Sequence, residues 1–342
     1  MKIHFLTNDG SPLQVTSKTI WGDGTQLGIG GAELAMLTLC EEWTKAGHEV
    51  VLFNDPREFG ASPFEQRTIA SFDPNERCDV LIAFRSPNLR ILGANTDLKV
   101  WFSTDQSTIG NFKAFRPMVD KVVCISPRHA EYFLQTYGID DGIVIDLPVR
   151  VHDYENKNIE KIRNRFIFTS IPTRGLDIML DMWPKLKKEI PDATLVVTSD
   201  FRLWSHLYGR DNEKFVSKAM RLPDVIYLSA VPRAQLVEEQ LKAEMHIYSS
   251  VYDELFCIAI AESQVAGVYT ITSDYGSLPT TNMMTVHKGE PRANIEEYIL
   301  SAKQFVNMPD YSHAYVKEIQ EKAIQRFHPD TILKEWENKV FS

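Results

Sequence analysis

The stretch FIFTSIPTRGLDIML, residues 166–180, runs from a short apolar segment through a polar turn into an amphipathic pattern. Apolar residues dominate 166–169, a turn containing a proline and a glycine follows, and apolar positions then recur at helical spacing. We therefore expect a strand over 166–169 and a helix over 175–190, with Pro184 kinking or splitting that helix. A strand followed by such a helix is typical of a parallel α/β sheet.

The same alternation of short apolar runs and helical patterns extends in both directions. On the C-terminal side, the expected strands cover 194–198, 225–228, 245–248 and 269–272, with helices over 233–242 and 257–266. On the N-terminal side, the expected strands cover 2–7, 49–53, 80–84, 98–102 and 121–125, with a helix over 31–45. Two helical patterns interrupted at Pro329 occupy residues 311–341. The pattern predicts an α/β protein with two doubly wound, Rossmann-like domains.

The length of 342 residues exceeds what one hydrophobic core usually supports. Segment 151–165 turns charged and loses its apolar periodicity, which marks a domain edge. We expect an N-terminal Rossmann-like domain over 1–155 and a C-terminal one over 156–325. A cleft between two such domains is where we expect a ligand.

Composition and charge narrow the class of partner. A formal net charge of -9 removes the electrostatic term that drives most nucleic-acid binding, so we expect no nucleic-acid partner and at most peripheral membrane contact. The first residues show neither a signal-peptide core nor a membrane span, which favours a cytoplasmic protein. The four cysteines form no Cys-x-x-Cys pair, and we expect buried free thiols. No Asp-x-Asp, His-Glu-x-x-His, Walker or Gly-x-Ser-x-Gly motif is present, so no metal site is expected.

A glycine-rich stretch, GIGGAE at residues 28–33, leads into the start of the first expected helix. Gly30 and Gly31 would let the backbone approach a ligand, and the helix start favours an anion. A simple flexible loop is the alternative interpretation. Glu33 stands where the dinucleotide fingerprint has its third glycine, which argues against a nicotinamide-dependent oxidoreductase.

Three charged residues carry candidate chemistry in the second half. Arg174, beside a glycine at a helix start, offers a fork of donors to a phosphate, unless it is an ordinary surface arginine. Glu254 precedes the 257–266 helix and could accept hydrogen bonds from sugar hydroxyls. Glu262, two turns inside that helix, could grip a ribose diol, although a structural salt bridge would also satisfy a carboxylate among apolar neighbours. The N–H groups that could hold a diphosphate or a sugar oxygen belong to Leu255, Phe256 and Cys257.

Four segments match one known family in order: GIGGAE, IPTRGLDIML, ELFCIAIAE with its Glu-x7-Glu spacing, and AGVYTITSDYGSLP. With these segments the chain resembles the retaining glycosyltransferases of the GT-B fold, in the family 4 grouping. The resemblance implies two Rossmann-like domains facing across a cleft and a C-terminal helix, 326–342, that crosses back to the N-terminal domain. It also implies a nucleotide-diphosphate sugar as donor substrate on the C-terminal domain, an acceptor on the N-terminal domain, and no required metal or separate cofactor.

Matched residue by residue, the resemblance assigns Glu254 to the donor sugar hydroxyls, Glu262 to the ribose and Arg174 to the diphosphate. It assigns Gly30 and Gly31 to a phosphate in the closed state or to the acceptor side. The sequence departs from the family pattern in three places, two of which concern candidate site residues. No second cation precedes the Arg174 turn, and the usual histidine of the N-terminal domain is replaced by a segment containing Asp105. Asp105 is a candidate for acceptor or sugar contact, with a helix cap as the alternative.

The expected function is therefore transfer of a hexose-like sugar from a nucleotide-diphosphate sugar to a saccharide or lipid-linked acceptor, with retention of anomeric configuration, in carbohydrate biosynthesis. A non-enzymatic binding or scaffold protein of the same fold is one alternative, motivated by the missing second cation. A sugar-nucleotide epimerase is another. We expect Glu254→Gln to lower turnover and Glu41→Gln to be nearly silent.

Overall fold

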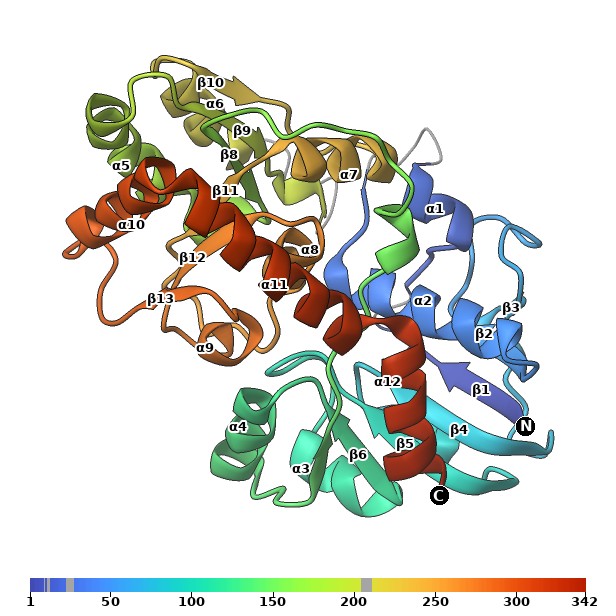
Figure 1. Cartoon of the computed structure of the whole chain (residues 1–342). Helices are drawn as coiled ribbons and strands as arrows, with labels where there is room; N and C mark the ends of the chain where they lie inside the picture. The colour runs from blue at the N-terminus through green and yellow to red at the C-terminus, as the bar shows by residue number, and fades with distance from the viewer. Residues whose placement is uncertain (9, 11–12, 23–27, 204–210) are drawn as a thin grey trace. The chain divides into compact units, whose positions relative to one another are not determined.

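The computed structural model describes residues 1–8, 10, 13–22, 28–203 and 211–342. Contacts divide the chain into two compact units, drawn in Figure 1. Unit 1 comprises Met1–Ile20, Gly31–Pro148 and His328–Ser342, and unit 2 comprises Trp21–Gly30 and Val149–Phe327. The chain thus passes to unit 2 after Pro148, where the sequence placed a boundary at 155, and returns after Phe327, where it placed one at 325.

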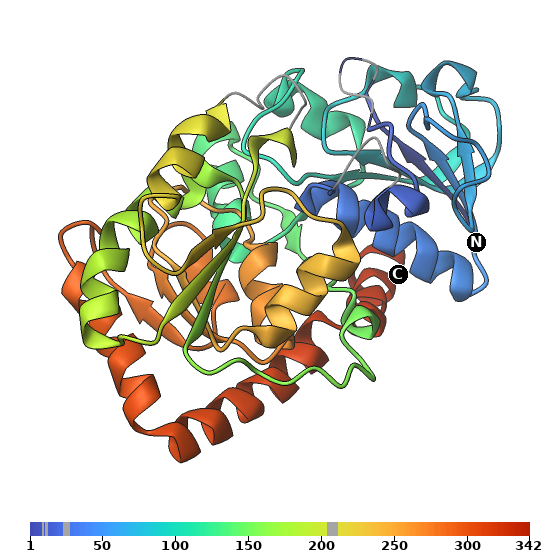
Figure 2. The same ribbon diagram turned by 90° about the horizontal axis from the view of Figure 1, so that it is seen from above.

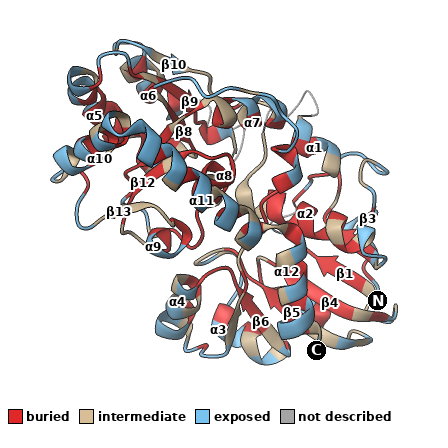
Figure 3. Cartoon of the chain, in the orientation of Figure 1, coloured by how far each residue is buried: buried red, intermediate tan, exposed pale blue. Residues whose placement is uncertain are grey.

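Unit 1 is built on one parallel sheet. Its described strands are β1 (Lys2–Leu6), β2 (Glu49–Phe53), β3 (Glu65–Arg67), β4 (Cys78–Phe84), β5 (Thr96–Phe102), β6 (Lys121–Cys124) and β7 (Gly142–Val144). They lie in the order β3-β2-β1-β4-β5-β6-β7, and Ile3 of β1 pairs with Val50 on one side and Val80 on the other. The central strands are buried on both faces, as a parallel sheet covered by helices requires (Figure 3).

The helices of unit 1 cover this sheet and include the C-terminal segment. They are α1 (Ser17–Trp21), α2 (Gly31–Lys45), α3 (Phe112–Phe115), α4 (Pro127–Tyr137) and α12 (Pro329–Trp336), and a π-helical turn follows over Glu337–Phe341. Trp336 of α12 packs edge-on against Trp43 of α2, with ring centroids 5.3 Å apart. Burial of these two indoles attaches residues 328–342 to unit 1.

Unit 2 repeats the design with a six-stranded parallel sheet among its described residues. Figure 2 shows these strands from a second direction. The strands are β8 (Arg165–Thr169), β9 (Thr194–Thr198), β10 (Val225–Tyr227), β11 (Met245–Tyr248), β12 (Tyr269–Ser273) and β13 (Thr285–His287). The helices are α5 (Leu176–Glu189), α6 (Glu213–Ala219), α7 (Arg233–Lys242), α8 (Ile258–Val265), α9 (Leu278–Thr281), α10 (Ile295–Asn307) and α11 (Pro309–Phe327). The order β10-β9-β8-β11-β12-β13 reverses between β8 and β11, so the loops after these two strands border the topological switch point.

The predicted fold class is confirmed, because both units are doubly wound α/β sheets. The helices α2 and α7 and the strands β2, β9 and β11 have the predicted bounds. Of the two effects predicted for Pro184, a kink or a split of its helix, the split does not occur, since α5 runs through Pro184. Burial of neighbours such as Trp183 offsets the backbone hydrogen bond that the proline cannot make. The missed strands β3, β7 and β13 have three residues each and fewer apolar residues than the equally short β10, which was predicted.

Two smaller expectations concern cysteines and membrane spans. All four cysteines are buried and free, as predicted. Among the residues that the structure describes, no helix combines the length and apolar character that crossing a membrane requires.

Candidate functional site

The carboxyl ends of β8 and β11 are adjacent in the unit 2 sheet, which brings their two loops together. Gly175, in the loop after β8, has φ of 107°, a conformation that L side chains rarely adopt. A Cβ at Gly175 would lie 2.9 Å from the carbonyl oxygen of Ser249 in the other loop. Ser170 also has a positive φ, of 140°, although it is not a glycine. The sequence therefore uses a glycine where the two loops touch and stores backbone strain beside it.

Arg174 and Glu254 form an ion pair across these two loops. The guanidinium also stacks on Tyr252, with Cζ 3.4 Å from the ring centroid. Burial lowers the pKa of Arg174, but the combined interactions with Glu254, Tyr248 and Tyr252 outweigh burial, and the pKa ends above its usual value. Arg174 is therefore a fixed, permanent cation at this edge of the sheet.

Glu254 is held from three directions. Its Oε2 accepts the bond from Arg174, while its Oε1 accepts a hydrogen bond of 2.7 Å from the hydroxyl of Tyr248. Its backbone carbonyl accepts a 2.7 Å bond from the N–H of Ser277 in the loop after β12. A Cβ at Gly276 would lie only 2.3 Å from the Glu254 nitrogen, so this approach requires a glycine. Glu254 itself is 4% exposed.

The segment between Glu254 and α8 supplies backbone donors. The side chains of Leu255, Phe256 and Cys257 are buried, and α8 begins at Ile258. Within the described part of the chain, the structure records no hydrogen bond from the N–H groups of these three residues. Free N–H groups before a helix are suited to an anion, because the helix dipole adds to their partial charge.

Glu262 is the fifth of the eight residues of α8, one turn rather than two turns inside the helix. Its carboxylate pairs with Arg233 and accepts a 3.4 Å bond from Gln240. Arg233 also donates to Asp153, at 2.9 Å, and its guanidinium lies over the ring of Tyr154. The salt bridge considered as an alternative is therefore present, and Glu262 belongs to a closed, buried network.

The loops after β9 and β10 are tied together at the same edge by Asp200. This fully buried carboxylate accepts hydrogen bonds from Arg202, Asn212 and Ser229. Burial raises the pKa of Asp200, but the hydrogen bonds from Arg202 and Ser229 outweigh it and leave the pKa below its usual range. The cluster fixes the loop geometry on the β9 side of the sheet.

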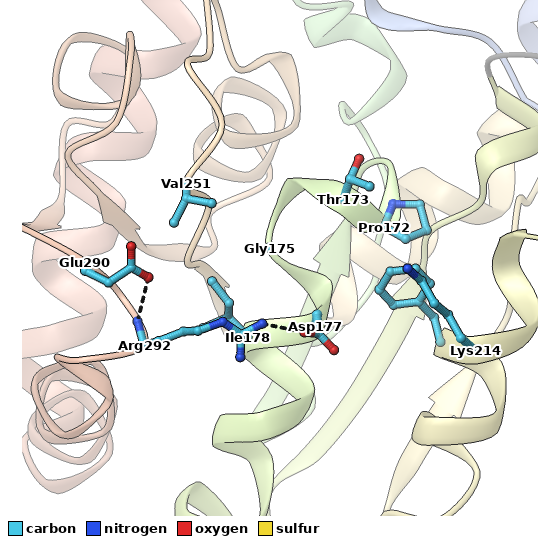
Figure 4. A pocket seen from close by; sticks show the side chains of 10 residues that line it. Pro172, Thr173, Gly175, Asp177, Ile178, Lys214, Val251, Glu290 and Arg292 are labelled. Carbon is cyan, nitrogen blue, oxygen red and sulfur yellow. Dashed lines mark hydrogen bonds and ion pairs between the residues drawn. The ribbon is translucent and has the colours of Figure 1, made fainter.

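A pocket of about 730 Å³ borders the Arg174 turn. Thr173 and Gly175 line it from the turn, and Val251 lines it from the loop after β11 (Figure 4). Arg292 and Asp177 form an ion pair at its wall. Arg174 and Glu254 are not among its lining residues, so this pocket lies beside the ion pair rather than over it.

In unit 1, Asp105 follows β5 and is held by Arg85, which follows β4. Arg85 Nε lies 2.7 Å from Asp105 Oδ2, and Arg85 NH1 lies 3.0 Å from Glu33 Oε1 in the first turn of α2. Asp105 does not cap the next helix, α3, whose cap is Asn111. Gly31 is the first residue of α2, and Gly30 belongs to unit 2.

Among the residues of these clusters that sequence reasoning missed are Tyr248, Arg233 and Arg85. Tyr248 ends a predicted strand, Arg233 begins a predicted helix and Arg85 follows a predicted strand, but none of them belongs to a recognised motif. The available signal was position alone, because Tyr248 ends β11 and Arg85 comes directly after β4 at the carboxyl edges where ligands bind in such sheets.

Residues 156–322 match the family model described as Glycosyl transferases group 1. No curated protein matches the chain. Several solved structures share its fold. Alr3699/HepE from Anabaena, in complex with UDP and glucose, is 17% identical with a TM-score of 0.71, covering 100% of this chain and 99% of that one.

Two further structures extend this comparison. Sucrose-phosphate synthase from Thermosynechococcus elongatus is 14% identical with a TM-score of 0.74, covering 100% of this chain and 99% of that one. WaaG, a glycosyltransferase involved in lipopolysaccharide biosynthesis, is 13% identical with a TM-score of 0.64, covering 99% and 100%. The fold is thus the GT-B fold, and together with the family match it supports a glycosyltransferase.

Proposed function

We propose, from the family match over residues 156–322 and the shared GT-B fold, that this protein is a retaining, metal-independent glycosyltransferase. It moves a sugar from a nucleotide-diphosphate donor to a saccharide or lipid-linked acceptor. The observation that carries the proposal is the pairing of Arg174 with Glu254 at the switch point of the unit 2 sheet.

Arg174 is assigned to the donor diphosphate. Its guanidinium keeps its charge at every physiological pH and presents a planar fork that suits phosphate oxygens. The N–H groups of Leu255, Phe256 and Cys257 add a second set of donors. Cationic and dipolar groups aimed at a leaving diphosphate stabilise the charge that develops in the transition state. Arg174 therefore supplies the charge stabilisation that the proposal assigns to the protein rather than to a metal.

Glu254 is assigned to the hydroxyls of the donor sugar. Its engagement with Arg174 and Tyr248 supports a role in orientation rather than as a nucleophile. Retention then follows if the departing diphosphate accepts the acceptor's proton on the face that it leaves. Glu262 is assigned to the ribose, because a carboxylate has about four lone-pair positions and its bonds to Arg233 and Gln240 use only part of them.

The acceptor is assigned to unit 1, where Asp105 would contact it. Gly30 and Gly31 are assigned to a donor phosphate in the closed state or to the acceptor. Two observations on other proteins guide the choice of substrates. Structures of the Anabaena protein contain UDP or UDP-glucose, so UDP-sugars are the first donors to test. WaaG is a glycosyltransferase involved in lipopolysaccharide biosynthesis, and its similarity supports the proposal of a saccharide or lipid-linked acceptor for this protein.

A non-catalytic sugar-nucleotide-binding protein is the second candidate. The observation that favours it is that residues 168–170, before the Arg174 turn, carry no second cation to bind the diphosphate. An epimerase on the same fold is distinguished by its product, because it releases a changed sugar nucleotide without any acceptor.

The test is thermal stability of the purified protein with UDP-, GDP-, ADP- and dTDP-sugars, each with and without EDTA. A ligand at about 100 times its Kd stabilises a protein by about 2.7 kcal/mol, which shifts the melting temperature by several degrees. We expect such a shift with one nucleotide class and no loss of it with EDTA. NMR of the product formed with a disaccharide acceptor panel then reports the anomeric configuration.

Each outcome decides between the candidates. A shift followed by transfer with retention supports the proposal, and a shift lost with EDTA contradicts metal independence. Binding without transfer, hydrolysis or epimerisation favours the non-catalytic candidate. No shift with any sugar nucleotide contradicts every donor-based function.

A further inference from the structure

Tyr248 is a buried residue at the carboxyl end of β11 that no motif singles out. Its hydroxyl donates a 2.7 Å hydrogen bond to Oε1 of Glu254 and lies 3.1 Å from Oγ of Ser170. The phenol has one O–H group, which it uses to donate the hydrogen bond to Glu254. The Ser170 hydroxyl is therefore the donor in the hydrogen bond between Ser170 and the phenol oxygen. The three residues form a directed chain from β8 through β11 to the carboxylate.

The phenol is fixed and stays protonated. Its ring stacks on Phe168 of β8, with centroids 5.8 Å apart and an interplanar angle of 16°, and His246 packs against it edge-on. Cys257, Glu254 and Arg174 also face this side chain. Burial, reinforced by Cys257 and Glu254, raises the pKa of Tyr248 well above its usual value. The hydroxyl therefore remains a donor at any pH at which the protein works.

The two partners of Glu254 differ in what else they must do. The Arg174 side chain is 18% exposed, and under the proposed function its guanidinium turns toward the diphosphate. Tyr248 is wholly buried and has no such second duty. Once a donor engages Arg174, the hydrogen bond from the Tyr248 hydroxyl is the one side-chain bond among the described residues that still orients the Glu254 carboxylate.

We propose that Tyr248 is a positioning residue that keeps the Glu254 carboxylate aimed at the donor sugar while Arg174 engages the diphosphate. The inference rests on the proposed function and deepens it. The inference divides the affinity for the donor into two contributions. The contribution of the sugar depends on the Tyr248 hydroxyl, whereas the contribution of the diphosphate does not.

The test compares Tyr248→Phe with Tyr298→Phe, which removes a hydroxyl from an equally buried tyrosine of unit 2. The Tyr298 hydroxyl has no hydrogen-bond partner among the described residues, so it is a matched control. The measurement is the Kd for UDP and for UDP-glucose by calorimetry, or for the diphosphate and sugar nucleotide that the panel selects. We expect Tyr248→Phe to weaken sugar-nucleotide binding about tenfold, with diphosphate binding unchanged, as the loss of one hydrogen bond to a charged group implies. Tyr298→Phe should change neither.

A double-mutant cycle with Glu254→Gln tests whether Tyr248 acts through Glu254. We expect Tyr248→Phe to have little further effect once Glu254 is replaced. Ser170→Ala removes the hydrogen-bond donor to the phenol and should raise the ratio of the Kd for UDP-glucose to the Kd for UDP, by less than Tyr248→Phe does. This variant tests the inference if Tyr248→Phe does not fold.

The outcomes keep this inference apart from the proposed function. Equal loss of diphosphate and sugar-nucleotide affinity in Tyr248→Phe, or additivity in the cycle, overturns the positioning role and leaves the glycosyltransferase proposal standing. An unchanged ratio in both Tyr248→Phe and Ser170→Ala also overturns it. If the wild-type protein binds no sugar nucleotide, the proposed function fails first and the inference falls with it.

Discussion

Glu254 and Glu262 are both 4% exposed and both paired with an arginine, yet the two pairs are built differently. Glu254 lies in a loop, and the side chain of its partner Arg174 is 18% exposed at the carboxyl edge of the sheet. Glu262 lies in α8, and its partner Arg233 is 3% exposed and also bound to Asp153. A ligand can reach the first arginine, whereas the second has its charge neutralised inside the unit.

The difference separates a pair whose arginine a diphosphate can reach from a pair whose arginine is enclosed in unit 2, where only the unused lone pairs of Glu262 are left for the proposed ribose contact. A buried ion pair contributes little net stability, but removing one partner leaves an uncompensated charge in a low dielectric. A pair at an edge can exchange one partner for a ligand at small cost. The Glu-x7-Glu motif in the sequence therefore does not reveal that its two glutamates have different surroundings. Variants of the two ion pairs should respond differently.

The largest expected effect is on stability, at the buried pair. Arg233→Met leaves the buried Glu262 carboxylate without its cation and removes one of the two arginines that pair with Asp153, which should destabilise unit 2 by about 3–5 kcal/mol. Chemical denaturation measured by circular dichroism checks this value. Lys322→Met, which breaks an exposed pair with Glu318, is the control and should cost at most about 1 kcal/mol. Equal effects of the two variants would contradict a structural role for the Arg233 network.

The next effect is on turnover, at the edge pair. Glu254→Gln keeps the shape of the side chain and removes its charge, which should lower kcat by roughly 100-fold. Binding of the bare nucleoside diphosphate should persist, since Arg174 is released from its partner. Steady-state kinetics and calorimetry report the two quantities.

The control for Glu254→Gln needs correction. Glu41, which the sequence suggested as a silent position, is 6% exposed in α2 and is therefore unsuitable. Glu318, whose side chain is 62% exposed, replaces it, and Glu318→Gln should leave kcat unchanged. A similar fall of kcat in both variants would show that Glu254 has no special role.

Low pH should reduce the stability of unit 2 through a buried histidine next to α8, the helix that carries Glu262. His246, which is hydrogen-bonded to Ser263 of α8, has its pKa lowered by burial to about 3. A folded-state pKa below the unfolded value of about 6.5 means that this stability is present above pH 6.5 and is lost as pH falls toward the folded pKa. The loss approaches about 1.4 kcal/mol per pH unit for one histidine.

Unfolding free energies between pH 7 and pH 5 test this dependence. His246→Asn should reduce the slope, whereas His313→Asn, at an exposed position, should not. A wild-type stability that does not fall between pH 6.5 and pH 5 would contradict the neutral state of His246.

The smallest expected effect separates charge from geometry at Arg174. Arg174→Lys keeps the positive charge but loses the planar fork and the stacking on Tyr252. Diphosphate affinity should fall about tenfold, with little change in melting temperature. Calorimetry with UDP measures it, and an affinity equal to that of the wild type would show that only charge matters at this position.

Much of the fold could be read from hydrophobic periodicity, because long helices such as α2 and α7 and buried strands such as β9 carry strong local signals. The three-residue strands β3, β7 and β13 could not, since they are formed by pairing with a neighbour and have almost no pattern of their own. The proline in α5 was overinterpreted, because burial of a helix face outweighs one missing backbone hydrogen bond.

The candidate site was predictable only in part. Arg174, Glu254 and Glu262 stand in segments whose order resembles a known family, and the sequence singled them out. The Arg85 bridge between Asp105 and Glu33 had no such signal, since it depends on β1, β4 and β5 being neighbours in the sheet.

The sequence by itself determined the two doubly wound units, most of their strands and helices, and the charged residues that a donor would need. The tertiary structure decided which of those charges meet. It paired Arg174 with Glu254 at an accessible edge, buried Glu262 against Arg233, and placed the Tyr248 hydroxyl on the carboxylate. The physical reason is that periodicity reports the burial of one segment, whereas the partner of a charge depends on the strand order and on loops that are far apart in the chain.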